Sequence, residues 1–208
     1  MEQPALILSG KYLRLVPLDE SHIESLVAAA AVDPELYKWS AVPQGIAETK
    51  RYIEIASGWR AAGTAMPFAI VREPDGLVLG STRFFDIERW PWPPDHPRHG
   101  RGYPDVCEIG YTWYTSAAIR TWANTEGKLL MLTHAFETWQ VQRVCLHTDA
   151  RNQRSRAAIE RIGGKYEGTL RAHRMAADST PRDSIRYSII AAEWPDVKQR
   201  LSQLLPRS

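Results

Sequence analysis

Cysteine is scarce in this chain, with two residues among 208. Cys107 and Cys145 lie far apart in the sequence and form no CxxC pair, which excludes a disulfide framework and a paired-cysteine zinc site. Both fall inside predicted strands, where a buried and reduced thiol is the ordinary state. Neither has an evident histidine or helix-N-terminal partner, so an activated cysteine nucleophile is not indicated.

Long apolar runs and a strong net charge are also absent. No segment approaches the roughly 18 apolar residues of a membrane span, and the opening residues MEQPALILSG lack the basic and apolar regions of a secretory signal. We therefore expect a cytoplasmic protein with no membrane partner. The net charge is only +2, which argues against a general affinity for nucleic acid.

The composition that remains is that of an ordinary globular protein, with 44% hydrophobic and 24% charged residues. The length can bury a sizeable core, and no polar linker interrupts it, so we expect a single domain over residues 1–208. Alternating apolar residues predict seven strands, at 11–17, 67–72, 77–86, 106–114, 143–148, 165–175 and 182–190. Apolar residues at helical spacing predict five helices, at 23–30, 48–62, 122–139, 152–161 and 193–205.

The order of these elements predicts an α+β fold. Short turns connect most strands as antiparallel neighbours, whereas a helix connects the fourth strand to the fifth and makes that pair parallel. We therefore expect a mixed, mostly antiparallel seven-stranded sheet with parallel strands 4 and 5, flanked by helices.

Residues 87–105 form a long aperiodic segment with five prolines, IERWPWPPDHPRHGRGYPD. A loop of this length inside a compact domain is often functional. We expect it to shape a substrate pocket, with Trp90 and Trp92 as walls; the alternative is a loop packed on itself. His96 and His99 have no third ligand at a standard spacing, so no metal site is expected.

Two strand-to-helix junctions carry the strongest functional signal. The fourth and fifth strands each end in a polar turn that opens a helix, at residues 120–125 and at Asn152. Exposed helix N-termini at the ends of neighbouring strands offer free amides and a positive dipole to an anion. This arrangement predicts a phosphorylated ligand, although Asn124, Thr125 and Asn152 are equally suited to plain helix capping.

Three segments resemble the GNAT acyl-CoA N-acyltransferases, and in particular the RimJ/RimL type. They are EIGYTW on the fourth strand, NTE at the start of the third helix, and TDARNQRSRAAIERIGGKYEGTLR from residue 148 onward. The resemblance runs from Leu13 to Trp194. It implies an N-acetyltransferase that carries an acetyl group from acetyl-CoA to an amine by direct attack in a ternary complex.

The resemblance also implies which residues hold acetyl-CoA. Members of the family carry a glycine-containing turn around the pyrophosphate, but the corresponding residues 120–125 here contain no glycine. The bulky Trp122 would have to point away from the phosphates. The predicted cofactor-binding residues are Tyr111, Thr112, Trp113, Arg120, Trp122, Ala123, Asn124, Thr125, Asn152, Ser155 and Arg156.

Two residues are candidates for catalysis. If Ile109 and Tyr111 face the core, strand alternation places Glu108 on the opposite side, where its carboxylate could take a proton from the amine. The plain alternative for Glu108 is a structural ion pair. By resemblance, the Ser155 hydroxyl could protonate the departing thiolate, at the low end of general-acid contributions. His147 lies within a strand, and we expect a structural role for it.

Two other functions stay open from the sequence. The glycine-free turn would also suit a non-catalytic CoA-binding module. A nucleic-acid partner could use arginines of the long loop and the fourth helix, namely Arg98, Arg101, Arg151, Arg154 and Arg156. The acceptor amine could be a protein N-terminus, a polyamine, an antibiotic or an amino acid, and the resemblance leaves a homodimer open.

Overall fold

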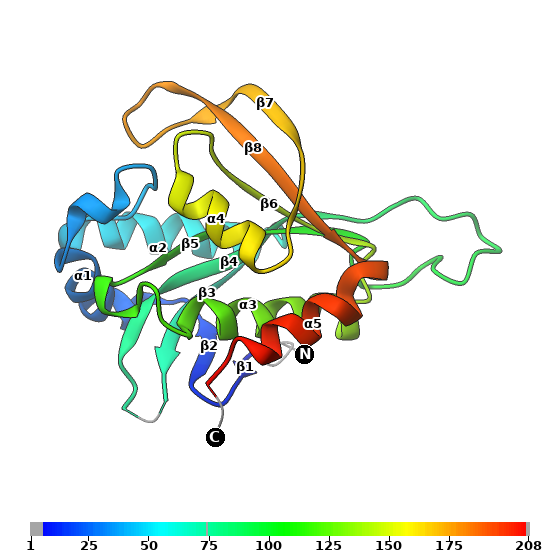
Figure 1. Cartoon of the computed structure of the whole chain (residues 1–208), viewed down its shortest axis with the longest axis horizontal. Coiled ribbons are helices and arrows are strands. Elements are labelled where there is room, and N and C mark those ends of the chain that lie inside the picture. The colour runs from blue at the N-terminus through cyan, green and yellow to red at the C-terminus, as the bar shows by residue number, and fades with distance from the viewer. Residues whose placement is uncertain (1–5, 74, 207–208) are drawn as a thin grey trace.

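The computed structural model describes residues 6–73 and 75–206. Its helices and strands form one mixed sheet with helices on both faces (Figure 1). The strands are β1 (Leu8–Ser9), β2 (Leu13–Pro17), β3 (Met66–Arg72), β4 (Val78–Glu88), β5 (Val106–Tyr114), β6 (Arg143–Asp149), β7 (Lys165–Met175) and β8 (Pro181–Ile190). The α-helices are α1 (Ile23–Ala31), α2 (Gly45–Ala61), α3 (Ala123–Thr133), α4 (Gln153–Arg161) and α5 (Trp194–Gln203).

The sheet confirms the predicted fold class, with one more strand than the sequence indicated. Its order is β1-β2-β3-β4-β5-β6-β8-β7, and only the pair β5–β6 is parallel. The additional strand is β1, where Leu8 and Ser9 pair with Leu15 and Arg14 of β2. Two residues are too few to establish an alternating pattern, so this strand could not be predicted from the sequence.

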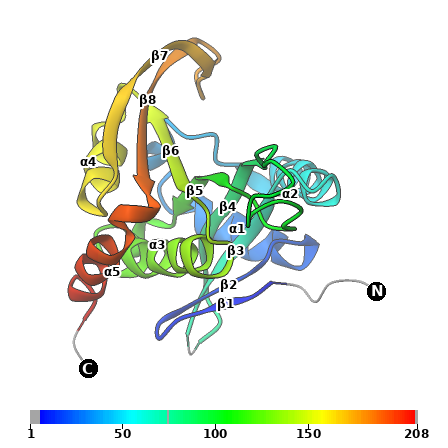
Figure 2. The same cartoon turned by 90° about the vertical axis from the view of Figure 1, so that its right-hand side faces the viewer.

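Alternating side chains of the sheet divide the core into two layers. In β3, Ile70 packs on the side of α3 and α5, whereas Ala69 and Val71 pack on the side of α1 and α2. Figure 2 shows α3 and α5 together along one side of the sheet. Since successive strand residues point to opposite faces, one run of apolar residues serves both layers.

The predicted helix over 122–139 is shorter in the structure. The α-helix ends at Thr133, and a wider π turn covers His134–Thr138. There the Trp139 amide donates to the His134 carbonyl, five residues back. The wider turn accompanies the packing of the Trp139 ring against Phe84, with centroids 4.7 Å apart.

The parallel pair β5–β6 separates soon after it begins. Its register covers only Val106–Glu108 against Arg143–Cys145, whereas β6 continues beside β8 as far as Asp149. Beyond Glu108, the edge of β5 that would face β6 is therefore unpaired. A bulge follows at Tyr111, which has a φ of 50°. The two strands thus form a V that opens toward the N-termini of α3 and α4.

The proline-rich loop, residues 89–105, projects from the sheet between β4 and β5 (Figure 1). Within the described part of the chain, no helix is both long and apolar enough to cross a membrane.

Candidate active site

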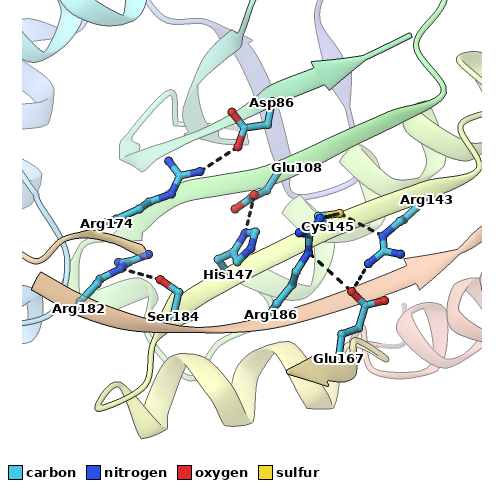
Figure 3. A network of polar contacts seen from close by, with 10 residues as sticks. All are labelled: Asp86, Glu108, Arg143, Cys145, His147, Glu167, Arg174, Arg182, Ser184 and Arg186. Atoms are coloured by element: carbon cyan, nitrogen blue, oxygen red, sulfur yellow. Dashed lines mark hydrogen bonds and ion pairs between the residues drawn. The ribbon is translucent and has the colours of Figure 1, made fainter. Parts of the chain in front are cut away.

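Glu108 and His147 form a buried pair at the vertex of the V. Nδ1 of His147 lies 2.6 Å from Oε2 of Glu108, and the two side chains are 6% and 5% exposed (Figure 3). A hydrogen bond from Nδ1 to a carboxylate leaves Nε2 as the unprotonated nitrogen of a neutral imidazole. That Nε2 is buried and has no hydrogen-bond partner among the described residues. The pair can therefore accept a proton.

His173 of β7 adds a second imidazole to this pair. Its ring centroid lies 5.1 Å from that of His147, and its buried Nδ1 also has no partner among the described residues. Burial, followed by the nearby charge of Arg174, lowers the pKa of His173. Both histidines are thus able to receive hydrogen bonds from a molecule that enters the site.

Two adjoining hollows give access to the pair. The smaller, of about 140 Å³, is lined by Glu108, His147 and His173 together with Arg174 and Arg186. The larger, of about 560 Å³, shares residues with it and extends along β7 toward the proline-rich loop. The lining residues of the larger hollow are Glu88, Trp90, Val106, Arg143, Glu167, Gly168, Thr169, Leu170 and Arg186.

Ion pairs hold the β7–β8 hairpin over these hollows. Arg174 of β7 reaches Asp86 of β4 at 2.9 Å, although three strands separate them in the sheet order. Glu167 forms an ion pair with Arg143, and its Oε2 lies 3.7 Å from Nε of Arg186. The hairpin therefore curls over the face that carries Glu108, and it walls the hollows with charged side chains (Figure 3).

The opposite face of the V carries a buried lysine. Nζ of Lys128 in α3 donates to Oγ1 of Thr112 at 2.8 Å, and Thr112 also bonds Oγ1 of Thr82 at 2.8 Å. Lys128 is 6% exposed, and burial lowers its pKa to about 7. The hydroxyl of the predicted cofactor residue Thr112 thus links α3 to the bulged part of β5.

The turn before α3 keeps a left-handed residue without a glycine. Arg120 adopts a φ of 61°, which costs a non-glycine residue of order 1–2 kcal/mol. Its side chain is exposed. The ring of Trp122 packs on Tyr12, with centroids 4.9 Å apart, so this bulky side chain has a partner in the N-terminal segment.

The N-terminus of α3 has free amides. The N-cap residue Trp122 makes no side-chain capping bond, and the amides of Asn124 and Thr125 have no acceptor among the described residues. Ala123 is buried, and its amide donates to Oγ1 of Thr121. Arg161 approaches the same turn from α4, with Nη1 3.0 Å from Oγ1 of Thr125. These groups suit an anion such as a diphosphate.

The N-terminus of α4 is capped by its own residue. Oδ1 of Asn152 accepts a hydrogen bond of 3.0 Å from the Ser155 amide, so the simple capping role of Asn152 is realised. The half-buried Ser155 hydroxyl has no partner among the described residues. Arg156 donates to the hydroxyl of Tyr187 at 3.4 Å, and this bond raises the pKa of Arg156.

The side chains of Tyr111 and Trp113 lie on the Glu108 face. Tyr111, 38% exposed, contacts Phe85 and Trp59, and the buried Trp113 contacts Tyr37. The expectation that Tyr111 shares the core face of Ile109 is wrong, because the bulge reverses the alternation after Gly110. On the α3 side, this segment therefore presents its backbone and the side chain of Thr112.

The proline-rich loop lines a hollow and also packs on itself, and its role in binding a substrate stays a prediction. Trp90 is 42% exposed and lines the larger hollow. Trp92 instead stacks on His96, with centroids 4.1 Å apart, and donates to Asp105 at 2.9 Å. One tryptophan therefore shapes the hollow, and the other packs the loop on itself. Among the described residues, no group of three potential ligands could hold a metal ion.

Sequence reasoning missed four side chains of this region: His147, His173, Arg161 and Arg186. The sequence indicated a structural role for His147, but the structure places it in contact with the predicted base. Its position on the predicted parallel strand 143–148, beside the strand that carries Glu108, could have indicated a place in the site. The other three depend on how β7, β8 and α4 curl around the V, which no local pattern encodes.

Comparison with known proteins places these features in a family. The family model described as "Acetyltransferase (GNAT) domain" matches residues 12–165. YdaF of Bacillus subtilis (strain 168), to which ribosomal N-acetyltransferase activity is ascribed, is 32% identical over 92 residues, or 44% of this chain and 49% of YdaF. The match thus spans about half the length of that relative.

Solved structures of similar proteins match the fold over nearly the whole chain. A GCN5-related N-acetyltransferase from Brucella melitensis has a TM-score of 0.81 at 27% identity, covering 98% of this chain and 87% of that one. RimJ of Mycobacterium smegmatis, solved in complex with CoA-disulfide, has a TM-score of 0.74 at 20% identity, covering 97% and 92%. At that identity, the second likeness shows the fold alone.

Proposed function

The chain belongs to the acetyltransferase (GNAT) domain family, with RimJ/RimL-like relatives, and we propose that it transfers an acetyl group from acetyl-CoA to a primary amine. The amine would be a protein N-terminus or a small molecule, and it would attack the thioester directly in a ternary complex. A cytoplasmic location, a single domain over residues 1–208 and a homodimer stay predictions.

The position of Glu108 carries this proposal. The last paired residues of the parallel strands are Glu108 and Cys145, so the carboxylate lies where the strands separate. A thioester threaded between the strands would meet an amine that comes from the hollows on the other face. Holding two reactants at one point can supply much of the rate, because it removes the entropy cost of their encounter.

The acetyl-CoA side of the V supports the same assignment. The free amides of Asn124 and Thr125, with Arg161 and Arg120 nearby, would hold the diphosphate at the N-terminus of α3. The pantetheine arm would then run along the unpaired edge of β5. Backbone N–H groups near the bulge would hold the thioester oxygen as it gains charge.

Proton transfer falls to residues on both sides of the V. An α-amino group has an unperturbed pKa near 8, so part of it is protonated at neutral pH and must lose a proton before attack. Glu108 and His147 would take that proton, directly or through water. Ser155, whose hydroxyl is unbonded among the described residues, would give a proton to the leaving thiolate.

The test begins with calorimetric titration of acetyl-CoA into the protein. Release of free CoA thiol is then measured with a panel of amines that includes peptides with free N-termini. We expect micromolar to millimolar binding, and turnover with at least one amine class. Glu108→Gln should bind acetyl-CoA normally and turn over slowly. Glu24→Gln, at an exposed position of α1, should match the native chain in both binding and turnover.

A non-catalytic CoA-binding module is the second candidate, because the turn before α3 lacks glycine. The left-handed conformation at Arg120 weakens this alternative, since the turn geometry is reached with another residue. Tight acetyl-CoA binding with no amine-dependent CoA release across the whole panel would favour the module over the enzyme.

A further inference from the structure

Three arginines and four carboxylates line the two hollows, and most of these carboxylates are already engaged by another residue. The carboxylates are Asp86, Glu88, Glu108 and Glu167, of which Figure 3 draws Asp86, Glu108 and Glu167. One of those carboxylates, Glu108, is engaged by His147. Asp86 is paired with Arg174, and Glu167 is shared between two arginines. Arg186 therefore has only a share of one carboxylate, and a buried charge that lacks a full partner is costly.

Arg186 lines both hollows, and its guanidinium is only partly satisfied by the residues around it. Its Nε is buried with no hydrogen-bond partner among the described residues, and the nearest carboxylate oxygen is 3.7 Å away on Glu167. Its Nη2 donates only to the thiol of Cys145, at 3.4 Å, and sulfur is a weak acceptor. The side chain as a whole is 35% exposed, so a ligand in the hollow can contact the guanidinium even though Nε itself is buried.

Two further arginines on this face have no carboxylate partner within 4 Å among the described residues. Arg182 of β8 makes a single hydrogen bond, from Nε to Oγ of Ser184. Arg83 of β4 is 1% exposed, and its Nε and Nη2 have no hydrogen-bond partner in the described part of the chain. Its guanidinium lies 4.2 Å from the ring centroid of Tyr111, on the same face as Glu108. These charges favour an anionic occupant at long range.

Resting on the proposed function, we propose that the acceptor is an amine that also carries a carboxylate, which binds Arg186. Arg186 is the register partner of His147 on the neighbouring strand, so the carboxylate would lie beside the Glu108–His147 pair. The amine and the carboxylate must therefore be separated by only a few bonds. Free amino acids meet this requirement, as do peptide N-termini with an acidic residue at position one or two.

The planar guanidinium explains why a carboxylate fits here. Arginine donates two parallel hydrogen bonds to a carboxylate, and such charge-assisted bonds are about twice as strong as neutral ones. The unbonded Nε and the weakly bonded Nη2 are adjacent donors of one guanidinium. Beyond Arg186, the larger hollow of about 560 Å³ has room for the rest of the acceptor.

The experiment compares matched acceptors in which a carboxylate is replaced by its amide, with rates expressed per neutral amine. One set pairs L-alanine and L-aspartate with alaninamide and asparagine amide. The other pairs the amidated tripeptides Ser-Asp-Ala and Ser-Asn-Ala, which places the carboxylate on a side chain. CoA release gives kcat/KM for each acceptor. We expect the carboxylate member of at least one set to be preferred about 10–100-fold, the range of a charge-assisted bond, and the preferred set identifies the source.

Variants show whether Arg186 creates that preference. Arg186→Gln should abolish it, mainly through KM, and Arg186→Lys should restore part of it. Arg200→Gln removes the same charge from an exposed position of α5 and should leave the preference unchanged. The melting temperature and the acetyl-CoA affinity of each variant are measured as controls for folding and for cofactor binding. The affinity should not change greatly, because acetyl-CoA is proposed to bind on the other face.

Three results would overturn the inference: equal use of charged and amidated acceptors, an equal loss on both members in Arg186→Gln, or acetyl-CoA binding with no acetylation of any carboxylate-bearing amine. The last of these leaves the acetyltransferase proposal standing if another amine is acetylated. Failure to bind acetyl-CoA at all would instead sink the proposed function itself.

Discussion

Glu108 on β5 and His147 on β6 meet at the point where two parallel strands stop pairing. Their 2.6 Å hydrogen bond joins the strands just past the last register pair, and both side chains are almost fully buried. A molecule can pass between neighbouring strands only where their hydrogen-bond ladder is interrupted, and the pair lies at such an interruption. The separation of β5 from β6 therefore explains the position of both the proposed base and its partner.

Replacing Glu108 by glutamine tests the proposed base. Gln is similar in shape but cannot accept a proton, so we expect kcat/KM to fall about 10²–10⁴-fold, the usual contribution of a positioned acid or base. The acetyl-CoA affinity should stay within twofold or so, because the cofactor contacts predicted here lie on the α3 side. Steady-state kinetics and calorimetry measure the two quantities. Unchanged turnover would remove Glu108 from this role.

Two amide substitutions separate the roles of His147. Asn places its amide nitrogen near the position of Nδ1, so His147→Asn keeps a donor for Glu108 and removes Nε2. Gln places its amide near Nε2 and removes the Nδ1 donor. If His147 only positions Glu108, His147→Asn should retain most activity and His147→Gln should lose it.

Both variants should lose activity if Nε2 itself relays the proton, because a side-chain amide cannot replace a basic imidazole nitrogen. In that case His147→Asn should lose activity about 10²-fold or more, and the acidic limb of its pH–rate profile should change as well. The native profile of kcat/KM against pH is the reference for both variants. Equal activity of both variants and the native chain would exclude either role.

Much of the fold could be predicted from the sequence because its elements have clear periods. The strands at 106–114 and 165–175 match the observed β5 and β7, since apolar alternation and flanking turns mark their ends. The parallel register could also be inferred from the intervening helix. What could not be predicted is β1, the π turn at His134–Thr138 and the reversal at Tyr111, each of which depends on packing partners distant in sequence.

Within the candidate site, the helix starts could be predicted from the sequence, and the residues around the hollows much less so. Short motifs around Arg120 and Asn152 mark helix starts, and helix starts have local signals. The Glu of the NTE segment shows the limit of such motifs, because Glu126 is buried and accepts bonds from the amides of Lys11 and Tyr12. His173 and Arg186 join the site only because the β7–β8 hairpin curls across the sheet.

Arg161 provides a test of the anion site at α3. Its guanidinium lies at the first helical turn, bonded to Oγ1 of Thr125 at 3.0 Å. We expect Arg161→Gln to weaken acetyl-CoA binding about 5–50-fold, as for loss of one charge-assisted bond, with kcat at saturation little changed. The affinity of the native chain should fall more steeply with salt than that of the variant. Arg51→Gln, on the exposed side of α2, is the matched control.

Lys128 makes stability depend on alkaline pH. Burial lowers its pKa to about 7 in the folded state, from an ordinary value near 10.5. Between these values the unfolded chain binds more protons than the folded one, so the free energy of unfolding rises with pH. The cost of burying the ammonium is complete below pH 7 and vanishes above about 10.5, with a slope of at most about 1.4 kcal/mol per pH unit.

Lys128→Met should remove this dependence, because methionine has a similar length and no charge. We expect the variant to be more stable than the native chain at pH 7, by a few kcal/mol at most, and the difference to shrink by pH 9.5. Urea unfolding at the two pH values measures it. Thr112 keeps its bond to Thr82 in the variant, so no orphaned hydroxyl offsets the gain. A difference that is the same at both pH values would mean that Lys128 stays charged in the fold, held by a partner that the bond to Thr112 does not supply.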